Sequence, residues 1–163
     1  MTESNQMQYR GYCYTAEQCD VFLNHDAMAS TTSPAENSWV DVTAPTIEII
    51  KKLTANVDLH ELAIDDLMQV TTRSKMTDYD DYLLLTLKIP VVNHRLGAKI
   101  KFKSVTFLLF ADQLFSFHKE PIDVFDEIAS QLEKSNSRLR HKKVDYLLYT
   151  VIDALIDKYM LLT

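Results

Sequence analysis

Residues 138–163 read RLRHKKVDYLLYTVIDALIDKYMLLT, and this stretch constrains how the rest of the chain can fold. Its apolar residues recur at helical spacing, at positions 144, 147, 148, 151, 152, 155, 159 and 162. The pattern predicts a helix with a continuous apolar stripe. A second apolar set covers much of the remaining circumference and consists of Tyr146, Tyr149, Ile156 and Met160. We therefore expect other elements to cover this helix on more than one side.

The predicted helix shows no stop signal at its C-terminal end. The stretch contains neither Gly nor Pro, and Leu161, Leu162 and Thr163 do not include a residue that usually caps a helix C-terminus. The sequence therefore predicts a helix that has been truncated, in a chain that is part of a longer protein.

Length, composition and charge bound the class of protein. A chain of 163 residues that is 47% hydrophobic suits one domain over 1–163, with a surface loop expected at 25–37. The net charge of -6 argues against binding to nucleic acid, which needs clustered Lys and Arg. Cys13 and Cys19 match no disulfide or metal pattern, so a reducing cytoplasm fits best. Because no apolar run reaches about 18 residues, we expect this chain to be soluble.

Strands and helices alternate along the sequence. We expect strands at 7–14, 39–42, 82–89, 99–110 and 114–118, and helices at 15–24, 45–56, 58–71 and 121–132. Pro90 bounds the third predicted strand, and Asp58 with Glu61 resembles a capping box. The predicted fold class is α/β, with a mixed β-sheet and helices on both faces. This αβα sandwich would end in the truncated long helix.

The common catalytic signatures are absent from the sequence. There is no GxSxG, no Walker A phosphate loop, no GxGxxG and no HExxH. The five histidines are scattered and none pairs with a Cys or His at metal-ligand spacing. The basic run 138–143 is expected to be the solvated start of the terminal helix. We therefore expect no enzymatic activity.

The carboxylates form a more informative pattern. Residues 58–81 contain seven acidic residues but only one Arg and one Lys. The acidic residues are Asp58, Glu61, Asp65, Asp66, Asp78, Asp80 and Asp81. Asp153 and Asp157 lie one turn apart in the terminal helix, where like charges repel. A Mg²⁺ ion would offset this repulsion. Ordinary salt bridges or a solvated helix surface would also explain the spacing, and spacing alone favours that explanation.

Two long motifs resemble the CorA-type magnesium transport proteins. Residues 59–89, LHELAIDDLMQVTTRSKMTDYDDYLLLTLKI, resemble the family segment that contains HP, LEDI, RPK and an acidic stretch with Tyr. Residues 140–162 resemble the family helix ADYLLYSLIDALVDDYF, and Trp39 begins a similar short strand, WVDVT. The resemblance runs from Trp39 to the C-terminus. Glu61 and Ser74 stand where the family has prolines.

The resemblance implies a regulatory site for Mg²⁺. In the family, Mg²⁺ bound between neighbouring cytoplasmic domains holds the pore closed, and the acidic pair of the LEDI segment supplies ligands. On this sequence the pair is Asp65 and Asp66, and Asp66 matches the principal ligand. Asp153 matches a water-mediated contributor, and Asp157 is a further candidate. Another principal carboxylate belongs to the family's stalk helix, so we expect this chain alone to bind Mg²⁺ weakly.

The resemblance also implies partners and a location. The chain would be the cytoplasmic sensor domain of a channel or transporter for Mg²⁺, with Co²⁺ as a second candidate ion, at the cytoplasmic side of the inner membrane. Its partners would be neighbouring copies in a homopentamer and its own stalk and transmembrane helices, through which alone it would meet the membrane. Two alternatives remain open: a zinc-transporting member of the same superfamily, and a non-catalytic α/β interaction domain.

Overall fold

The computed structural model describes residues 6–30, 37–68, 73–93, 97 and 99–161. They form a seven-stranded sheet in the order β2-β1-β3-β7-β6-β5-β4. The strands are β1 (Gln8–Tyr14), β2 (Cys19–Phe22), β3 (Asn37–Thr43), β4 (Lys75–Asp78), β5 (Leu83–Asn93), β6 (Lys99–Leu109) and β7 (Gln113–His118). Strands β3 and β7 run parallel, whereas the other neighbours are antiparallel.

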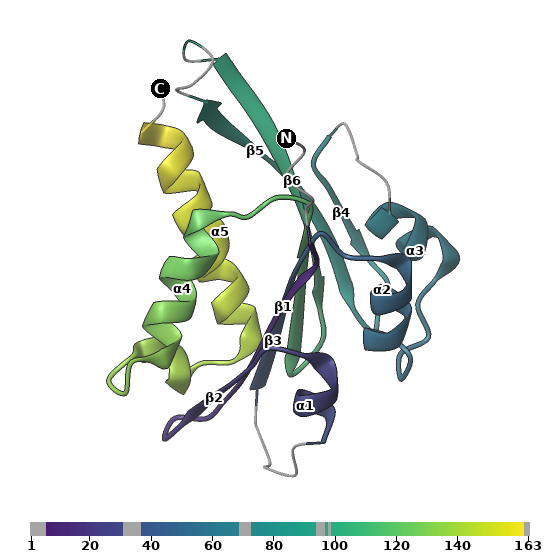
Figure 1. Cartoon of the computed structure of the whole chain (residues 1–163), viewed down its shortest axis with the longest axis vertical. Helices are drawn as coiled ribbons and strands as arrows, with labels where there is room; N and C mark the ends of the chain where they lie inside the picture. Colours follow the sequence, from purple (N-terminus) through teal and green to yellow (C-terminus); the bar gives the residue numbers. More distant parts are fainter. Residues whose placement is uncertain (1–5, 31–36, 69–72, 94–96, 98, 162–163) are drawn as a thin grey trace.

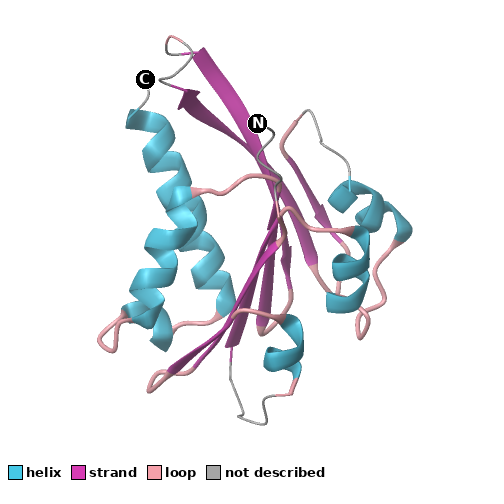
Figure 2. Cartoon of the chain, viewed as in Figure 1, coloured by secondary structure: helices cyan, strands magenta, loops and turns pink. Residues whose placement is uncertain are grey.

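Helices cover both faces of the sheet, which confirms the predicted α/β class (Figure 1, Figure 2). The helices are α1 (His25–Ala29), α2 (Ile47–Leu53), α3 (Glu61–Met68), α4 (Asp123–Glu133) and α5 (Val144–Leu161), with a 3₁₀ turn, η2, at Arg138–His141. Helices α4 and α5 pack on one face and α2 and α3 on the other. Each face therefore has its own apolar core.

The alternation of side chains along the central strands creates the two cores. In β3, Trp39 faces α4 and α5, whereas Val40 and Val42 face α2 and α3. In β7, Leu114 faces α4 and α5, whereas Phe115 faces α2 and α3. Because successive side chains of a strand point to opposite faces, a strand covered on both sides is apolar on both. This explains why these strands carry apolar side chains on both of their faces.

The region before β3 differs from the prediction. Residues 15–24 were expected to form a helix, but Cys19–Phe22 is the edge strand β2, which pairs with β1 after a turn closed by a hydrogen bond from Thr15 N to Gln18 O at 2.9 Å. Part of the predicted loop at 25–37 is helical, because the Asn24 side chain accepts a hydrogen bond from the Ala27 N–H at 2.7 Å and caps α1. Residues 31–36 lie outside the described part of the chain.

Two predicted boundaries in the middle of the chain are also wrong. Asp58 does not begin a capping box, because α3 begins at Glu61 and the Leu62 N–H donates to His60 Nδ1 at 3.2 Å. The predicted end of this helix, at 69–71, lies outside the described residues. Strand β5 continues through Pro90 to Asn93. Beyond Thr86 it pairs only with β6, and a strand with one open side tolerates a residue that lacks an N–H.

The terminal helix has one buried and one exposed side. Its buried stripe matches the prediction and consists of Val144, Leu147, Leu148, Val151 and Leu155. Of the second apolar set, Tyr149 is 62% and Ile156 is 53% exposed, so the described part of the chain does not cover that side. The side chains of Tyr159, Met160 and Leu162 lie outside the described residues.

The basic run at 138–143 is only partly solvated, because η2 buries Arg140. The Arg140 Nε donates to Leu132 O at 2.8 Å, and another guanidinium nitrogen donates to Glu133 O. These carbonyls end α4 and have no partner within the helix. Arg140 therefore caps α4 and fixes the approach of α5, whereas Arg138 is exposed.

We expect the substitution Arg140→Ala to lower the free energy of unfolding by about 2 kcal/mol, because it leaves two helix-end carbonyls unpaired. Urea unfolding followed by circular dichroism measures this loss. The control, Arg138→Ala, removes the same charge from an exposed position and should change stability by less than about 0.5 kcal/mol. Equal losses in the two variants would contradict the capping role.

Candidate metal site

Helix α3 presents its acidic pair at the outer edge of the sheet. Ala63 and Leu67, four residues apart, are its buried residues and face the sheet. Asp65 is exposed, whereas the Asp66 side chain is only 17% exposed and its Oδ2 accepts a hydrogen bond from Lys75 Nζ at 3.1 Å. Lys75 begins β4, the edge strand of the sheet. The Asp66 carboxylate is therefore held in place beside an open edge of the domain.

An aromatic stack anchors the start of α3. The rings of Tyr79 and Tyr82 lie 4.9 Å apart and those of His60 and Tyr79 lie 5.7 Å apart. The His60 N–H also donates to the Tyr82 hydroxyl at 3.0 Å. Desolvation raises the pKa of Tyr79, and the negative charge of Asp66 adds to that rise. The stack thus ties the acidic helix to the β4–β5 turn.

Asp78, at the end of β4, and Asp80, in the turn that follows, have a conformational role. Asp78 Oδ1 accepts a hydrogen bond from the Asp80 N–H at 2.9 Å. Asp80 itself has a φ of 70°, in the left-handed region that Asp tolerates better than most residues. These side chains therefore shape the turn between β4 and β5.

The other predicted ligands lie in a different layer. Asp153 and Asp157 are both exposed on α5, across the sheet from α3 (Figure 1). Within one chain they are therefore not brought together with Asp65 and Asp66. The described residues contain no group of three or more His, Cys, Asp or Glu side chains able to hold a metal. An ion at Asp66 would need water or another chain for its remaining ligands.

A buried polar network in the sheet was missed by sequence reasoning. The Trp39 Nε1–H donates to Ser116 Oγ at 3.0 Å, and the Ser116 hydroxyl donates to Asp41 Oδ1 at 2.6 Å. His118 lies with Nε2 2.8 Å from Asp41 Oδ1 and Nδ1 2.8 Å from Glu120 O. A carbonyl can only accept, so Nδ1 carries a hydrogen.

The network does not have the order of a hydrolase triad. In a triad the histidine lies between the serine and the acid, whereas here Asp41 lies between Ser116 and His118. Ser116 is fully buried and directs its hydroxyl hydrogen to the carboxylate. The parallel register of β3 and β7 brings the four side chains together. The arrangement therefore joins the two central strands rather than exposing a nucleophile.

The family is shown by the sequence. The family described as "CorA-like Mg2+ transporter protein" matches residues 34–163. The chain belongs to this family. It is also 26% identical over 126 residues to the cobalt/magnesium transport protein CorA of Thermotoga maritima. That match covers 77% of this chain but 36% of the relative, so the chain spans about a third of that CorA protein.

Solved structures with the same fold include those of CmaX, CorA and ZntB. The full-length CmaX protein has a TM-score of 0.76 at 20% identity, over 99% of this chain and 49% of CmaX. The soluble domain of CorA from Methanocaldococcus jannaschii has a TM-score of 0.70 at 13% identity, over 98% and 59%. The cytoplasmic domain of ZntB from Vibrio parahaemolyticus has a TM-score of 0.69 at 18% identity, over 94% and 61%. Among the described residues, no helix has the length and apolar character needed to cross a bilayer.

We expect Asp41→Asn to cost about 3 kcal/mol of unfolding free energy, because it deprives the buried His118 and Ser116 of their shared carboxylate. Urea unfolding followed by tryptophan fluorescence suits this test, since Trp39 is the single tryptophan and belongs to the network. Asp112→Asn makes the same chemical change at an exposed turn and is the control. A similar small effect of both substitutions would show that the network does not hold β3 against β7.

Proposed function

We propose that this chain is the cytoplasmic regulatory domain of a CorA-like transporter for Mg²⁺, with Co²⁺ as a second candidate ion. In this proposal, Mg²⁺ bound at Asp66 between neighbouring copies favours the closed pore. Membership of the CorA-like family supports the transporter class. The position of Asp66, fixed by Lys75 at the open edge of the sheet and adjacent to exposed Asp65, supports the role of the pair.

Helices α3 and α5 lie on opposite faces of the sheet, and this arrangement suits the assembly of copies into a ring. In a head-to-tail ring, one side of each subunit meets the other side of the next. Asp65 and Asp66 on α3 could then approach the neighbour's α5 side, where Asp153 and Asp157 are exposed. Carboxylates across such a boundary repel each other, and a divalent ion between them turns the repulsion into attraction.

Regulation would follow from a difference in affinity between two states. A cation that binds the closed ring more tightly than the open one shifts the population toward the closed ring. A difference of about 1–3 kcal/mol per site is enough for an allosteric response. When Mg²⁺ is scarce, the sites empty and the acidic surfaces repel. The subunits would then loosen, and the helices that follow the domain would carry this change to the pore.

Asp66→Asn in the whole transporter should raise the Mg²⁺ concentration that half-protects it from protease by about tenfold, because a charged ligand is lost. The same variant should be inhibited less by Mg²⁺ in a transport assay. Asp58→Asn, in the same acidic region and also exposed, is the matched control and should behave like the parent protein. Unchanged inhibition and protection in Asp66→Asn would remove this residue from the sensor.

Lys75→Met should have the opposite effect, because the Lys75 ammonium competes with a cation for the Asp66 carboxylate. Since the lysine is half exposed, we expect a modest tightening of Mg²⁺ binding, about two- to fivefold. Titration of the whole transporter with Mg²⁺ under limited proteolysis gives the measurement. Lys99→Met, at the exposed start of β6, controls for the change in net charge. Weaker Mg²⁺ binding after Lys75→Met would mean that the lysine helps to build the site.

A zinc-transporting relative is the alternative within the superfamily. The likeness to the ZntB cytoplasmic domain is one of fold, at 18% identity. Uptake of Mg²⁺, Co²⁺ and Zn²⁺ by the whole transporter separates the two functions, because selectivity depends on the pore. Uptake of Zn²⁺ without Mg²⁺ would support the alternative.

A further inference from the structure

The chain leaves the two central strands in opposite directions. Strand β3 leads through Ala44 and Pro45 to α2 on one face, and β7 leads through Lys119 and Glu120 to α4 on the other face. Neighbouring parallel strands whose connections diverge in this way leave a crevice at their carboxyl ends, which is where α/β sheets usually bind ligands. A cavity of about 510 Å³ lies at this position.

The cavity extends along β6, because β6 continues beyond the end of its neighbour β7. The pairing of β6 with β7 stops at Val105 and His118, whereas β6 begins at Lys99. Residues 99–104 therefore pair only with β5 and leave an open strand edge along the cavity. Ile100 and Phe102, which alternate with Lys99, Lys101 and Lys103 along β6, are 61% and 54% exposed. The open edge offers backbone N–H and C=O groups to a ligand.

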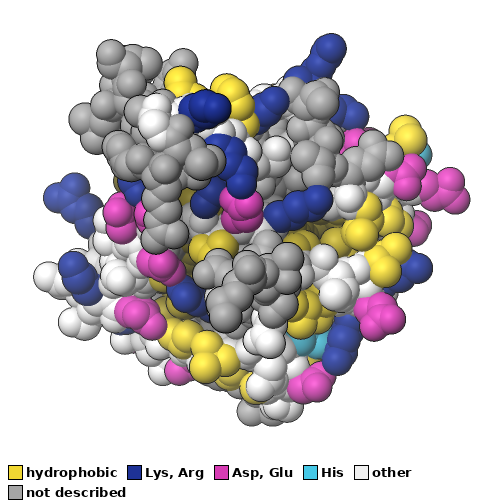
Figure 3. Space-filling model, turned by 45° about the horizontal axis from the view of Figure 1, so that its top comes forward, with side chains coloured by type: hydrophobic (Ala, Val, Ile, Leu, Met, Phe, Trp, Pro, Cys, Tyr) yellow, Lys and Arg dark blue, Asp and Glu magenta, His cyan; other side chains and the backbone are white. Residues whose placement is uncertain are grey.

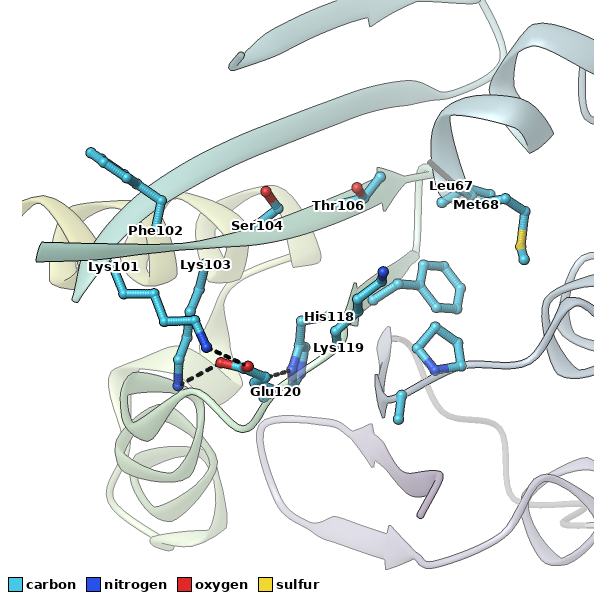
Figure 4. Close-up of a pocket in the computed structure, with 13 residues that line it drawn as sticks. Leu67, Met68, Lys101, Phe102, Lys103, Ser104, Thr106, His118, Lys119 and Glu120 are labelled. Carbon is cyan, nitrogen blue, oxygen red and sulfur yellow. Dashed lines mark hydrogen bonds and ion pairs between the residues drawn. The ribbon is translucent and has the colours of Figure 1, made fainter. Parts of the chain in front are cut away.

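The inner surface of the cavity is mixed in character. Ser104 and Thr106 of β6 supply hydroxyl groups, and Phe117, which pairs with Thr106 across the sheet, also lines the cavity. Met68 of α3 stands at one end and Phe102 at the other, as Figure 4 shows. Apolar ends with a few hydroxyls between them suit a flat organic body, and the volume falls in the range of small-molecule sites.

The rim of the cavity is positively charged although the whole chain carries a net charge of -6. Lys101, Lys103 and Lys119 line it together with one acid, Glu120. Figure 3 shows Lys and Arg side chains interspersed with Asp and Glu over the face of the molecule that it draws. A local excess of positive charge on an acidic protein attracts anions to that place.

Two of these lysines already converge on one carboxylate (Figure 4). Lys101 Nζ lies 2.9 Å from one Glu120 oxygen and Lys103 Nζ lies 3.7 Å from the other. The hydrogen bond from Lys101 is the main reason that the pKa of Glu120 is lowered, and the charge of Lys103 contributes. Lys101 therefore hydrogen-bonds this carboxylate, whereas Lys103 lies within ion-pair distance of it and donates its hydrogen bond to Pro121 O at 2.8 Å.

We propose that this cavity binds a nucleotide-sized organic anion. Lys101 and Lys103 alternate with Phe102 and Ser104 along β6, so they point to the opposite face of the sheet, as Figure 4 shows. The ligand's phosphate or carboxylate would contact the two lysines in competition with Glu120. Its organic body would pass the open strand edge of residues 99–104 to reach Ser104 and Phe102 on the other face. The site uses none of the four candidate metal ligands, so it stands apart from the proposed Mg²⁺ regulation.

The test is a titration of this chain, without Mg²⁺, by adenosine 5′-monophosphate, adenosine and inorganic phosphate, followed by the backbone amide NMR signals. The nucleotide should shift the signals of Ser104 and Thr106 and bind at least about tenfold more tightly than either fragment, because only it fills both parts of the cavity. If adenosine bound as tightly as the nucleotide, the site would not recognise an anionic group. If phosphate bound as tightly as the nucleotide, the site would not recognise an organic body. Shifts confined to other residues, or no binding, would overturn it.

Charge variants locate the anionic group. The double variant Lys101→Gln with Lys103→Gln should weaken nucleotide binding about tenfold or more, whereas Glu120→Gln should strengthen it several-fold by removing the internal competitor. Lys99→Gln and Glu127→Gln change the same charges at exposed positions that do not line the cavity, so they should bind like the parent chain. Circular dichroism verifies that each variant is folded. Weaker binding by folded Glu120→Gln, or the same effect in the control variants, would contradict the proposed contact.

Discussion

The parallel pairing of β3 with β7 is the constraint on which the rest of the structure depends. It joins a three-stranded N-terminal half of the sheet, β2-β1-β3, to the antiparallel half β7-β6-β5-β4. Strand pairing between distant segments is costly because the loop between them must be closed first. The network of Trp39, Asp41, Ser116 and His118 lies across this junction and uses hydrogen bonds that form only in the observed register. Polar side chains at the centre of the molecule thus specify which two strands meet.

Both functional proposals follow from that junction. The divergence of the chain after β3 and β7 opens the cavity at their carboxyl ends, and the order of the second half of the sheet places β4 and Asp66 at its far edge. The same layering leaves acids on α3 on one side and an exposed, partly apolar α5 surface on the other. A domain with two different sides of this kind is suited to head-to-tail contact with copies of itself. The regulatory proposal uses that contact, whereas the anion site is complete within one chain.

Local sequence patterns predicted the elements that bury their side chains on a regular period. Strands β3 and β7 and helix α5 were found because their apolar spacing matches their conformation over several residues. Strand β2 was missed because an edge strand of four residues with partial burial has little pattern, and its conformation comes from pairing with β1. Capping by Arg140 was missed for a related reason, because the carbonyls it contacts belong to another helix.

The candidate site was predicted only in part. The resemblance to the family pointed to Asp65 and Asp66 from the sequence alone, but not to Lys75 as the partner of Asp66, because β4 has no clear strand pattern. Contacts between residues far apart in the chain, such as Ser116 with Asp41 or Lys101 with Glu120, depend on register and on where strands end. Neither the register nor the ends of the strands can be predicted from the local spacing of residues. The cavity at the end of β7 exists because β6 is longer than its neighbour, which only the paired sheet reveals.

A structure of the whole protein determined in abundant Mg²⁺, and again after chelation, tests the central claim most directly. The account predicts an ion about 2.1 Å from an Asp66 oxygen, or held through its water, at the boundary with a neighbouring copy in the closed form. It also predicts that this ion is absent, and the boundary wider, after chelation. A closed ring in which Asp66 remains paired with Lys75, far from every neighbouring copy and without an ion, would contradict it.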